Sequence, residues 1–133
     1  MRYAGSPMPV YDLKQLAPTF AAAANAADVE TLVGLYTEDA VFVIPGGVTV
    51  QGTEAIRAVL GQLLGGGRKM AFEHVYIFDN GDTALVRGVW TLTAPGPDGA
   101  DTVTTGSSVE VLKKQPDGSW KYFIDHPWGG DAL

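Results

Sequence analysis

Glu110 is the residue of this 133-residue chain whose type and position most favour chemistry. It lies in the middle of a predicted β-strand, where alternation along the strand places it on the same face as Ser108 and Leu112. If that face lines a pocket, burial would raise the pKa of the carboxyl group and make it an acid, a base or a hydrogen-bond donor. The alternative is a glutamate that faces solvent or an interface and pairs with a lysine or arginine.

Asp125 and His126 are two further catalytic candidates, and they are neighbours in the last predicted strand. In a regular strand they point to opposite faces, so they cannot form a dyad with each other. Alternation groups His126 with Trp120, Tyr122 and Ile124, and it groups Asp125 with Lys121 and Phe123. Only one of these two rows can face a pocket, and the residues themselves leave both possibilities open. For His126, a structural role with a bond to the backbone is the alternative.

His74 lies in an alternating row with three aromatic residues of another predicted strand: Phe72, Tyr76 and Phe78. Such a histidine could bind an aromatic or carbonyl ligand, or act as a base. A partly buried interface row is the alternative.

Two tryptophans and an arginine are candidates for ligand contacts. Arg87 and Trp90 share a predicted strand but face opposite ways, and either could point inward. Arg87 could bind a ligand carboxylate or pair with a surface acid. Trp128 follows the last strand and could cap a ligand, or it could pack against the C-terminal segment.

The composition excludes several classes of protein. There is no cysteine, which rules out disulfides, thiolate nucleophiles and thiolate metal sites, and the two histidines lack carboxylates at ligand spacing. We therefore expect no metal and no cofactor. The net charge of −6 argues against nucleic-acid and membrane partners, and the absence of a long apolar run predicts a cytoplasmic protein.

The first half of the chain is predicted to be helical. Residues 1–11 are expected to form a flexible arm, and residues 12–133 a single domain. Asp12 caps the first predicted helix, Asp28 caps a second that runs to Tyr36, and Thr53 caps a third that ends at a triple glycine. Residues 40–44 and 48–50 form a small hairpin before the third helix.

The second half contains four long β-type runs, at residues 69–79, 82–94, 101–114 and 119–127. Short turns separate them, so they predict an antiparallel four-stranded meander. Strands of this length must twist and curl. The fold class is therefore α+β, with three helices on the inner face of a strongly curved sheet that forms a cone around an apolar pocket.

Three stretches of the chain resemble the nuclear transport factor 2-like superfamily, and in particular its SnoaL-like and ketosteroid-isomerase-like branch. They comprise residues 25–42, residues 52–56, and residues 109–121 with the following Asp-His-Pro-Trp at 125–128. The resemblance covers nearly the whole chain after residue 12, and it implies the cone-shaped, cystatin-like fold.

The same resemblance allows the isomerase site to be compared position by position. Phe20, Ile44 and Leu60 stand where the steroid isomerases carry the oxyanion tyrosine, the carboxylate base and a supporting tyrosine. Tyr36 matches the network tyrosine of the second helix, and Glu110 matches the protonated acid of the oxyanion hole. Since the base is missing, the resemblance argues against the known steroid isomerase reaction.

Two functions remain after this comparison. The first is binding of a hydrophobic carbonyl or hydroxyl compound, with acid–base chemistry of the isomerase, cyclase, lyase or hydrolase type. The predicted catalytic residues are Glu110, Tyr36, His74, Asp125 and His126, and the predicted ligand contacts are Phe20, Ile44, Leu60, Trp90, Phe123 and Trp128. The second is a non-catalytic ligand-binding or association module. Both include a homodimer formed through the sheet.

Overall fold

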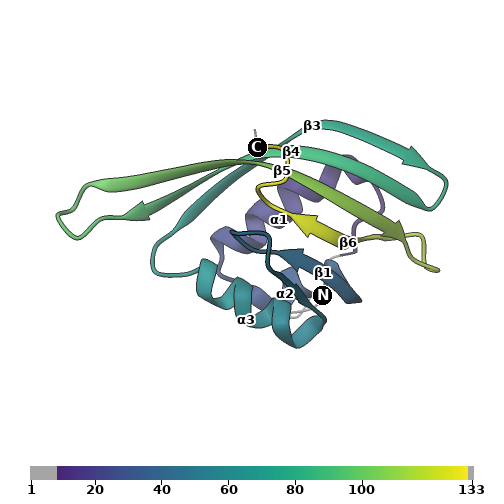
Figure 1. Cartoon of the computed structure of the whole chain (residues 1–133), viewed down its shortest axis with the longest axis horizontal. Helices are drawn as coiled ribbons and strands as arrows, with labels where there is room; N and C mark the ends of the chain where they lie inside the picture. Colours follow the sequence, from purple (N-terminus) through teal and green to yellow (C-terminus); the bar gives the residue numbers. More distant parts are fainter. Residues whose placement is uncertain (1–8, 132–133) are drawn as a thin grey trace, which may run out of the picture.

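A computed structural model describes residues 9–131 of the chain, which fold into a single curved sheet with helices packed on one face (Figure 1). The helical elements are η1 (Leu13–Gln15), α1 (Leu16–Asn25), α2 (Val29–Val33) and α3 (Thr53–Leu63). The strands are β1 (Tyr36–Val43), β2 (Thr49–Gln51), β3 (Lys69–Asn80), β4 (Thr83–Pro95), β5 (Asp101–Lys114) and β6 (Trp120–His126). The predicted α+β class is confirmed.

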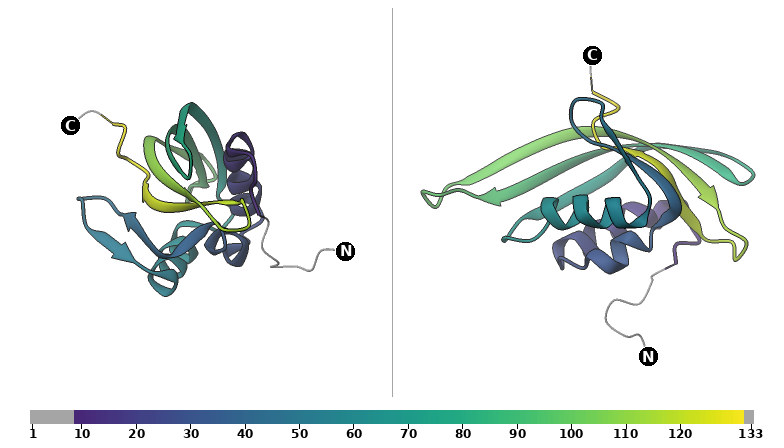
Figure 2. Two further views of the ribbon diagram at one scale, coloured as in Figure 1. Left: turned by 90° about the vertical axis from the view of Figure 1, so that its right-hand side faces the viewer. Right: turned by 60° about the horizontal axis from the view of Figure 1, so that its bottom comes forward.

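The sheet has the strand order β2-β1-β6-β5-β4-β3. Strands β3 to β6 form the predicted antiparallel meander, and β1 joins it by pairing with β6 in parallel. Figure 2 shows that the long strands arch over the helices, so that the sheet has a concave inner face and a convex outer face. This curvature positions side chains from several strands around one volume.

Of the caps predicted for the first two helices, Asp28 does cap α2, whereas Asp12 caps the short η1 and Gln15 is the N-cap of α1. Asp12 accepts a hydrogen bond from the backbone N–H of Lys14, and Asp28 accepts one at 3.1 Å from the N–H of Thr31. The predicted cap of the third helix was wrong: Gly52 occupies the N-cap with φ of 95°, a left-handed conformation that suits glycine. Thr53 is the first residue of the helix.

The second helix is shorter than predicted, and this moves Tyr36 to a different element. The helix ends at Val33, and Tyr36 begins β1. The backbone carbonyl of Leu35 accepts a hydrogen bond at 2.8 Å from the N–H of Tyr122 in β6. Pairing with a distant strand therefore takes this segment out of the helical pattern that its apolar spacing suggests.

A β-bulge interrupts the alternation of side chains in β3. In β3, His74 pairs with Gly88 and Tyr76 pairs with Arg87, which leaves Val75 as an extra residue. The predicted row that joins His74 to Tyr76 and Phe78 is therefore wrong beyond His74, because an extra residue reverses the faces that follow it.

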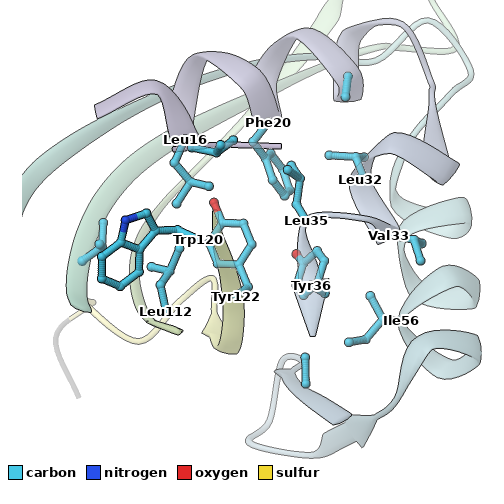
Figure 3. Close-up of a cluster of buried hydrophobic side chains, with 14 of the residues drawn as sticks. Leu16, Phe20, Leu32, Val33, Leu35, Tyr36, Ile56, Leu112, Trp120 and Tyr122 are labelled. Carbon is cyan, nitrogen blue, oxygen red and sulfur yellow. The ribbon is translucent and has the colours of Figure 1, made fainter. Parts of the chain in front are cut away.

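The core lies between the helices and the inner face of the sheet. Figure 3 shows Leu16 and Phe20 of α1 packed towards Trp120 and Tyr122 of β6, with Ile56 of α3 on the other side of Tyr36. At the start of the described chain, Val10 is buried and its carbonyl accepts a hydrogen bond from Trp120. The first eight residues of the predicted arm lie outside the described residues.

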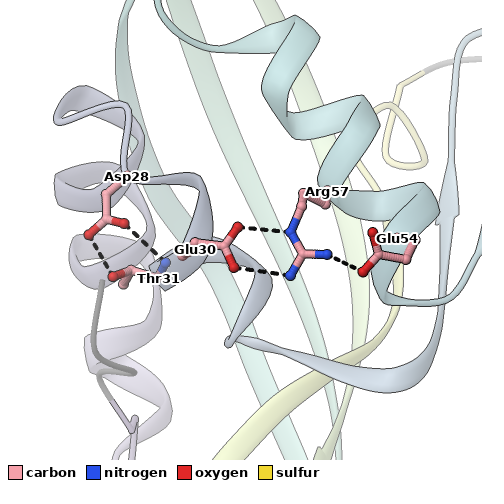
Figure 4. A network of polar contacts seen from close by, with 5 residues as sticks. All are labelled: Asp28, Glu30, Thr31, Glu54 and Arg57. Atoms are coloured by element: carbon pink, nitrogen blue, oxygen red, sulfur yellow. Dashed lines mark hydrogen bonds and ion pairs between the residues drawn. The ribbon is translucent and has the colours of Figure 1, made fainter. Parts of the chain in front are cut away.

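A surface network joins the second and third helices (Figure 4). Arg57 of α3 bonds to both carboxylate oxygens of Glu30 in α2, at 2.8 and 3.0 Å, and also contacts Glu54. Pairs this exposed contribute little stability each. Within residues 9–131, no helix has the length and apolar character needed to cross a membrane.

Candidate functional site

A cavity of about 220 Å³ lies between the inner face of the sheet and helices α1 and α3. Its wall is apolar except for a small polar group contributed by β5 and β6. The lining residues are Phe20, Phe42, Leu60, Leu63, Leu64, Met70, Phe72, Trp90, Leu92, Thr104, Ser108, Glu110, Tyr122, Asp125, Pro127 and Trp128. Such a pocket, with few convergent polar groups, is typical of a small-molecule site.

Two glycines shape the sheet side of the cavity. A Cβ on Gly106 would lie 2.3 Å from the ring of Trp90, and a Cβ on Gly88 would lie 2.3 Å from the ring of Phe72. Both rings therefore lie directly on the glycine backbone of the neighbouring strand. Any side chain at either glycine would displace an aromatic ring that lines the cavity.

The polar group of the cavity is a pair of carboxyls on adjacent strands. Glu110 of β5 is directly opposite Asp125 of β6, a position that brings Cβ atoms to about 5 Å. Both are buried, with 2% and 6% of their surface exposed. Each has one oxygen held by a hydroxyl: Ser108 donates to Glu110 Oε1 at 2.8 Å, and Tyr36 donates to Asp125 Oδ2 at 2.6 Å.

Burial and mutual repulsion set the charge of this pair. Burial, followed by the negative charge of Asp125, raises the pKa of Glu110 to about 9, against a smaller lowering by the Ser108 hydrogen bond. Burial raises the pKa of Asp125 to about 6, opposed by the hydrogen bond from Tyr36. Burial therefore favours the protonated form of both carboxyls, and it does so more strongly for Glu110 than for Asp125.

The Glu110 carboxyl uses only one of its two oxygen atoms in hydrogen bonds within the described residues. Its Oε2 atom is buried and has no hydrogen-bond partner among residues 9–131. A buried polar atom without a partner is costly in an apolar wall, and a ligand oxygen in the cavity would satisfy it. The hydroxyl of Tyr122, in the same wall, also has no partner within the described chain, and burial raises its pKa well above the usual value.

A bulge in β6 decides which side chains reach the carboxyl pair. Val111 pairs with Ile124 and Leu112 pairs with Tyr122, so Phe123 is the extra residue. Tyr122 and Asp125 consequently share the inner face, although strict alternation would separate them. The expectation that only one of the two alternating rows faces inward was wrong, because each row supplies one residue.

The structure places several other predicted residues in the cavity wall. Phe20, Leu60, Trp90 and Trp128 line it alongside the two carboxyls. The indole N–H of Trp90 donates to the carbonyl of Pro127 at 2.7 Å, and its ring meets that of Trp128 edge to face at 5.6 Å. These contacts hold the C-terminal segment against the cavity.

Five predicted residues do not line the cavity, and one of them, Tyr36, is connected to it only through its hydrogen bond to Asp125. Ile44 packs against the core, and Phe123 lies 5.6 Å from the ammonium of Lys113. His74 meets Phe72 edge to face at 5.6 Å, and burial lowers its pKa. His126 follows Asp125 onto the other face, where it contacts the backbone of Gly129.

Arg87 also lies away from the cavity, on the outer face of the sheet. Its guanidinium donates to Ser107 Oγ at 2.9 Å and to the carbonyl of Gly130 at 3.1 Å. Its role is therefore to fasten the C-terminal segment to the sheet. The question of whether Arg87 or Trp90 faces inward is answered in favour of Trp90.

Tyr122 is the main cavity residue that the sequence analysis did not single out as a candidate. The bulge that turns it inward has no signature in the residues around it. Leu63 and Leu64, by contrast, follow Leu60 in the apolar spacing of the third helix, so that pattern could have found them. The part of the chain that the structure describes contains no group of three or more side chains able to hold a metal ion.

Comparison with known proteins identifies the family. The model of the SnoaL-like domain matches residues 18–123, and the chain belongs to this family. No curated protein sequence matches the chain significantly.

Solved structures show the same fold at low sequence identity. A nuclear transport factor 2-like protein with a cystatin-like fold from Novosphingobium aromaticivorans is 20% identical, with a TM-score of 0.77 over 91% of this chain and 81% of its own. A ketosteroid isomerase-like protein from Erwinia carotovora is 24% identical, with a TM-score of 0.70 over 86% and 91%. A Xanthomonas campestris protein named as a calcium/calmodulin-dependent protein kinase II association domain is 19% identical, with a TM-score of 0.74 over the full length of both chains.

Proposed function

We propose that this protein binds a small apolar ring compound with one carbonyl or hydroxyl group, and transfers a proton on it. The observation that carries the proposal is the carboxyl pair: Glu110, with an unpartnered Oε2, lies opposite Asp125 in an otherwise apolar cavity, and burial raises the pKa of Glu110 further than that of Asp125. In this proposal Glu110 is neutral and Asp125 is ionised at pH 7. Two titratable groups whose surroundings separate their pKa values supply an acid and a base at the same pH.

The roles of the two carboxyls follow from their charges. Glu110 Oε2–H donates its proton, or a hydrogen bond, to the ligand oxygen, and Asp125 takes a proton from the carbon next to the oxygen-bearing carbon. When Glu110 gives up its proton, the ligand becomes an enol, Glu110 becomes a carboxylate and Asp125 becomes a neutral acid. The enol then returns its O–H proton to Glu110 while Asp125 gives a proton back to a ligand carbon, which restores the carboxyl pair. Isomerisation, cyclisation and dehydration all use this exchange, and it needs no bound cofactor.

The remaining candidates have different roles in this proposal. Tyr36 is a positioning residue, because its hydroxyl holds Asp125 Oδ2 at 2.6 Å and stabilises the ionised carboxylate. Phe20, Leu60, Trp90 and Trp128 contact the ligand. His74, His126, Ile44 and Phe123 receive no role, since their side chains do not line the cavity.

Hydrogen–deuterium exchange on a bicyclic ketone tests the proposal without a known substrate. The protein is incubated with 1-tetralone in deuterated buffer at neutral pH, and loss of the hydrogens next to the carbonyl is followed by NMR. We expect the wild type to accelerate the exchange, and Asp125→Asn and Glu110→Gln to lower the catalysed rate about 100-fold or more. Quenching of tryptophan fluorescence measures binding, because Trp90 and Trp128 line the cavity.

The matched control is Glu73→Gln, which removes an exposed carboxyl from the same sheet and should leave exchange unchanged. Glu110→Gln should keep the affinity for 1-tetralone within a few-fold, because the amide N–H₂ still donates to the ketone oxygen. A rate of exchange that survives Glu110→Gln unchanged would refute the role of Glu110.

The alternative function is a non-catalytic, homodimeric ligand-binding or association module. It is supported by an apolar outer face whose exposed residues include Val75, Phe78, Leu85, Val89, Val103 and Ile124, and by a structural neighbour named as an association domain. A second copy of the chain is the partner proposed for this face.

Light scattering tests the homodimer at micromolar concentration. We expect the mass of a dimer for the wild type and of a monomer for Val89→Lys, because Val89 lies in the middle of the outer face of β4 and a lysine there would bury its charge. A monomeric wild type would contradict the dimer. A dimer that binds 1-tetralone without catalysing exchange would favour the non-catalytic module.

A further inference from the structure

Ser108 is a buried polar residue of the cavity wall whose contribution to the proposed proton transfer is not yet defined. It precedes Glu110 by two residues in β5, lies on the same inner face, and is 2% exposed. It packs against Gly88 of β4, where an added Cβ would lie only 3.0 Å from the serine oxygen. The hydroxyl is therefore fixed in place by the neighbouring strand.

The hydrogen bond of Ser108 distinguishes the two oxygens of the Glu110 carboxyl. Ser108 donates to Oε1 at 2.8 Å, whereas Oε2 has no partner within the described residues. A neutral carboxyl has one carbonyl oxygen, the better acceptor, and one hydroxyl oxygen, which carries the proton. Donation to Oε1 makes that atom the carbonyl oxygen and leaves the proton on Oε2.

We infer that Ser108 is a positioning residue that holds the proton of Glu110 on Oε2, where a ligand oxygen in the cavity can accept it. Without the serine hydroxyl, the proton can reside on either oxygen, and one of the two arrangements turns the lone pairs of the carbonyl oxygen towards the ligand. The facing carboxyl group, that of Asp125, is oriented in the same way, because the hydroxyl of Tyr36 donates a hydrogen bond to its Oδ2 atom. Each carboxyl of the pair is thus oriented by one hydroxyl.

This inference rests on the proposed function, but infrared spectroscopy tests it without a substrate. The carbonyl stretching band of neutral Glu110 is isolated at neutral pH by subtracting the spectrum of Glu110→Gln from that of the wild type. In Ser108→Ala we expect the band to move to higher frequency, because a carbonyl oxygen that loses a hydrogen bond vibrates faster. We also expect the pKa of Glu110 to rise further, because the hydrogen bond from Ser108 lowers it.

Ser107→Ala is the matched control, because Ser107 is the adjacent serine of β5 on the outer face and bonds to Arg87 rather than to Glu110. The Glu110 band should not move in this variant. Ser108→Thr retains a hydroxyl and should restore the wild-type frequency. Exchange on 1-tetralone should fall about fivefold in Ser108→Ala, the equivalent of one hydrogen bond.

The outcomes separate this inference from the proposed function. A Glu110 band that is present in the wild type and unmoved in Ser108→Ala overturns the role of Ser108 and leaves the proposed function intact. A shifted band together with no catalysed exchange in any variant supports the role of Ser108 and overturns the proposed reaction. The absence of a neutral carboxyl band at neutral pH overturns both.

Discussion

The two faces of the β3–β6 meander differ in what their polar residues contact, although both faces are rich in apolar side chains. On the inner face, Glu110 and Asp125 are buried against each other. On the outer face, Glu73 is exposed and Val89 is 42% exposed. The face of the sheet on which a glutamate lies therefore decides its environment: Glu73 is in contact with solvent, whereas Glu110 is a buried acid in the cavity wall.

The largest contrast expected between the faces is in packing. Leu112, on the inner face of β5, is fully buried, whereas Leu85, on the outer face of β4, is 42% exposed. Leu112→Ala should lower the free energy of unfolding by about 3 kcal/mol through a cavity in the core. Leu85→Ala should lower it by about 1 kcal/mol or less. Urea unfolding measures both, and equal losses would contradict the difference between the faces.

The second contrast concerns the glycines that lie beneath the aromatic rings. Gly106→Ala should destabilise the protein by about 2 kcal/mol, because the new Cβ collides with the ring of Trp90. Gly61→Ala is the control: it lies in α3 with no atom within 4 Å of a Cβ, so alanine should stabilise the helix by about 1 kcal/mol. The near-ultraviolet circular dichroism of the tryptophans should change in the first variant only.

The third contrast is the pH dependence of stability. The pKa of Glu110 is about 9 in the folded protein and ordinarily 4.5, so between these values the unfolded chain has released a proton that the folded chain keeps. Stability therefore falls as pH rises through this window, by about 1 kcal/mol per pH unit from this group.

Comparison of variants isolates this effect from the other titrating groups. Relative to the wild type, Glu110→Gln should become progressively more stable between pH 5 and pH 8 in urea unfolding, because the amide does not ionise. Glu73→Gln, on the outer face, should remain parallel to the wild type. Parallel curves for all three proteins would show that Glu110 is not a neutral buried acid.

The smallest effect on stability is expected from removing the hydroxyl of Tyr36. Tyr36→Phe removes the hydrogen bond to Asp125 and should cost about 1 kcal/mol of stability. That bond lowers the pKa of Asp125, so its loss should raise this pKa. In a plot of the rate of deuterium exchange on 1-tetralone against pH, the fall in rate on the acidic side (the acidic limb) should therefore move to higher pH. Tyr76→Phe is the control: Tyr76 follows the bulge in β3, where its side chain no longer shares the face of His74. An acidic limb that stays in place in Tyr36→Phe would rule out the positioning role of Tyr36.

Much of the fold could be predicted from local signals. The turn residues between the long strands correctly predicted the antiparallel meander. The apolar spacing of the helices placed Phe20 and Leu60 on their inward-facing sides. The alternation around Glu110 was also predictive, because β5 is regular from Ser108 to Val111, and this places Glu110 on the same face as Ser108. These features depend on residues close together in the chain.

The errors have a common physical cause, which is pairing between distant segments. Tyr36 looked helical because its apolar spacing is helical, but the backbone of the preceding Leu35 bonds to Tyr122 in β6. The bulge at Val75 places Tyr76 and Phe78 on the opposite face from His74, which the alternation had not predicted. The bulge at Phe123 places Asp125 on the same face as Tyr122. A bulge depends on how two strands fit together, so neither strand shows it alone.

The sequence by itself determined the α+β class, the order of the elements and the strand face that Glu110 shares with Ser108. It did so because turns, helix periodicity and strand alternation are local properties of the chain. The tertiary structure alone decided that Asp125 would lie opposite Glu110 and that burial would raise the pKa of both carboxyls. That outcome requires the register between β5 and β6 and the exclusion of water by α1 and α3, and burial is a property of the whole fold.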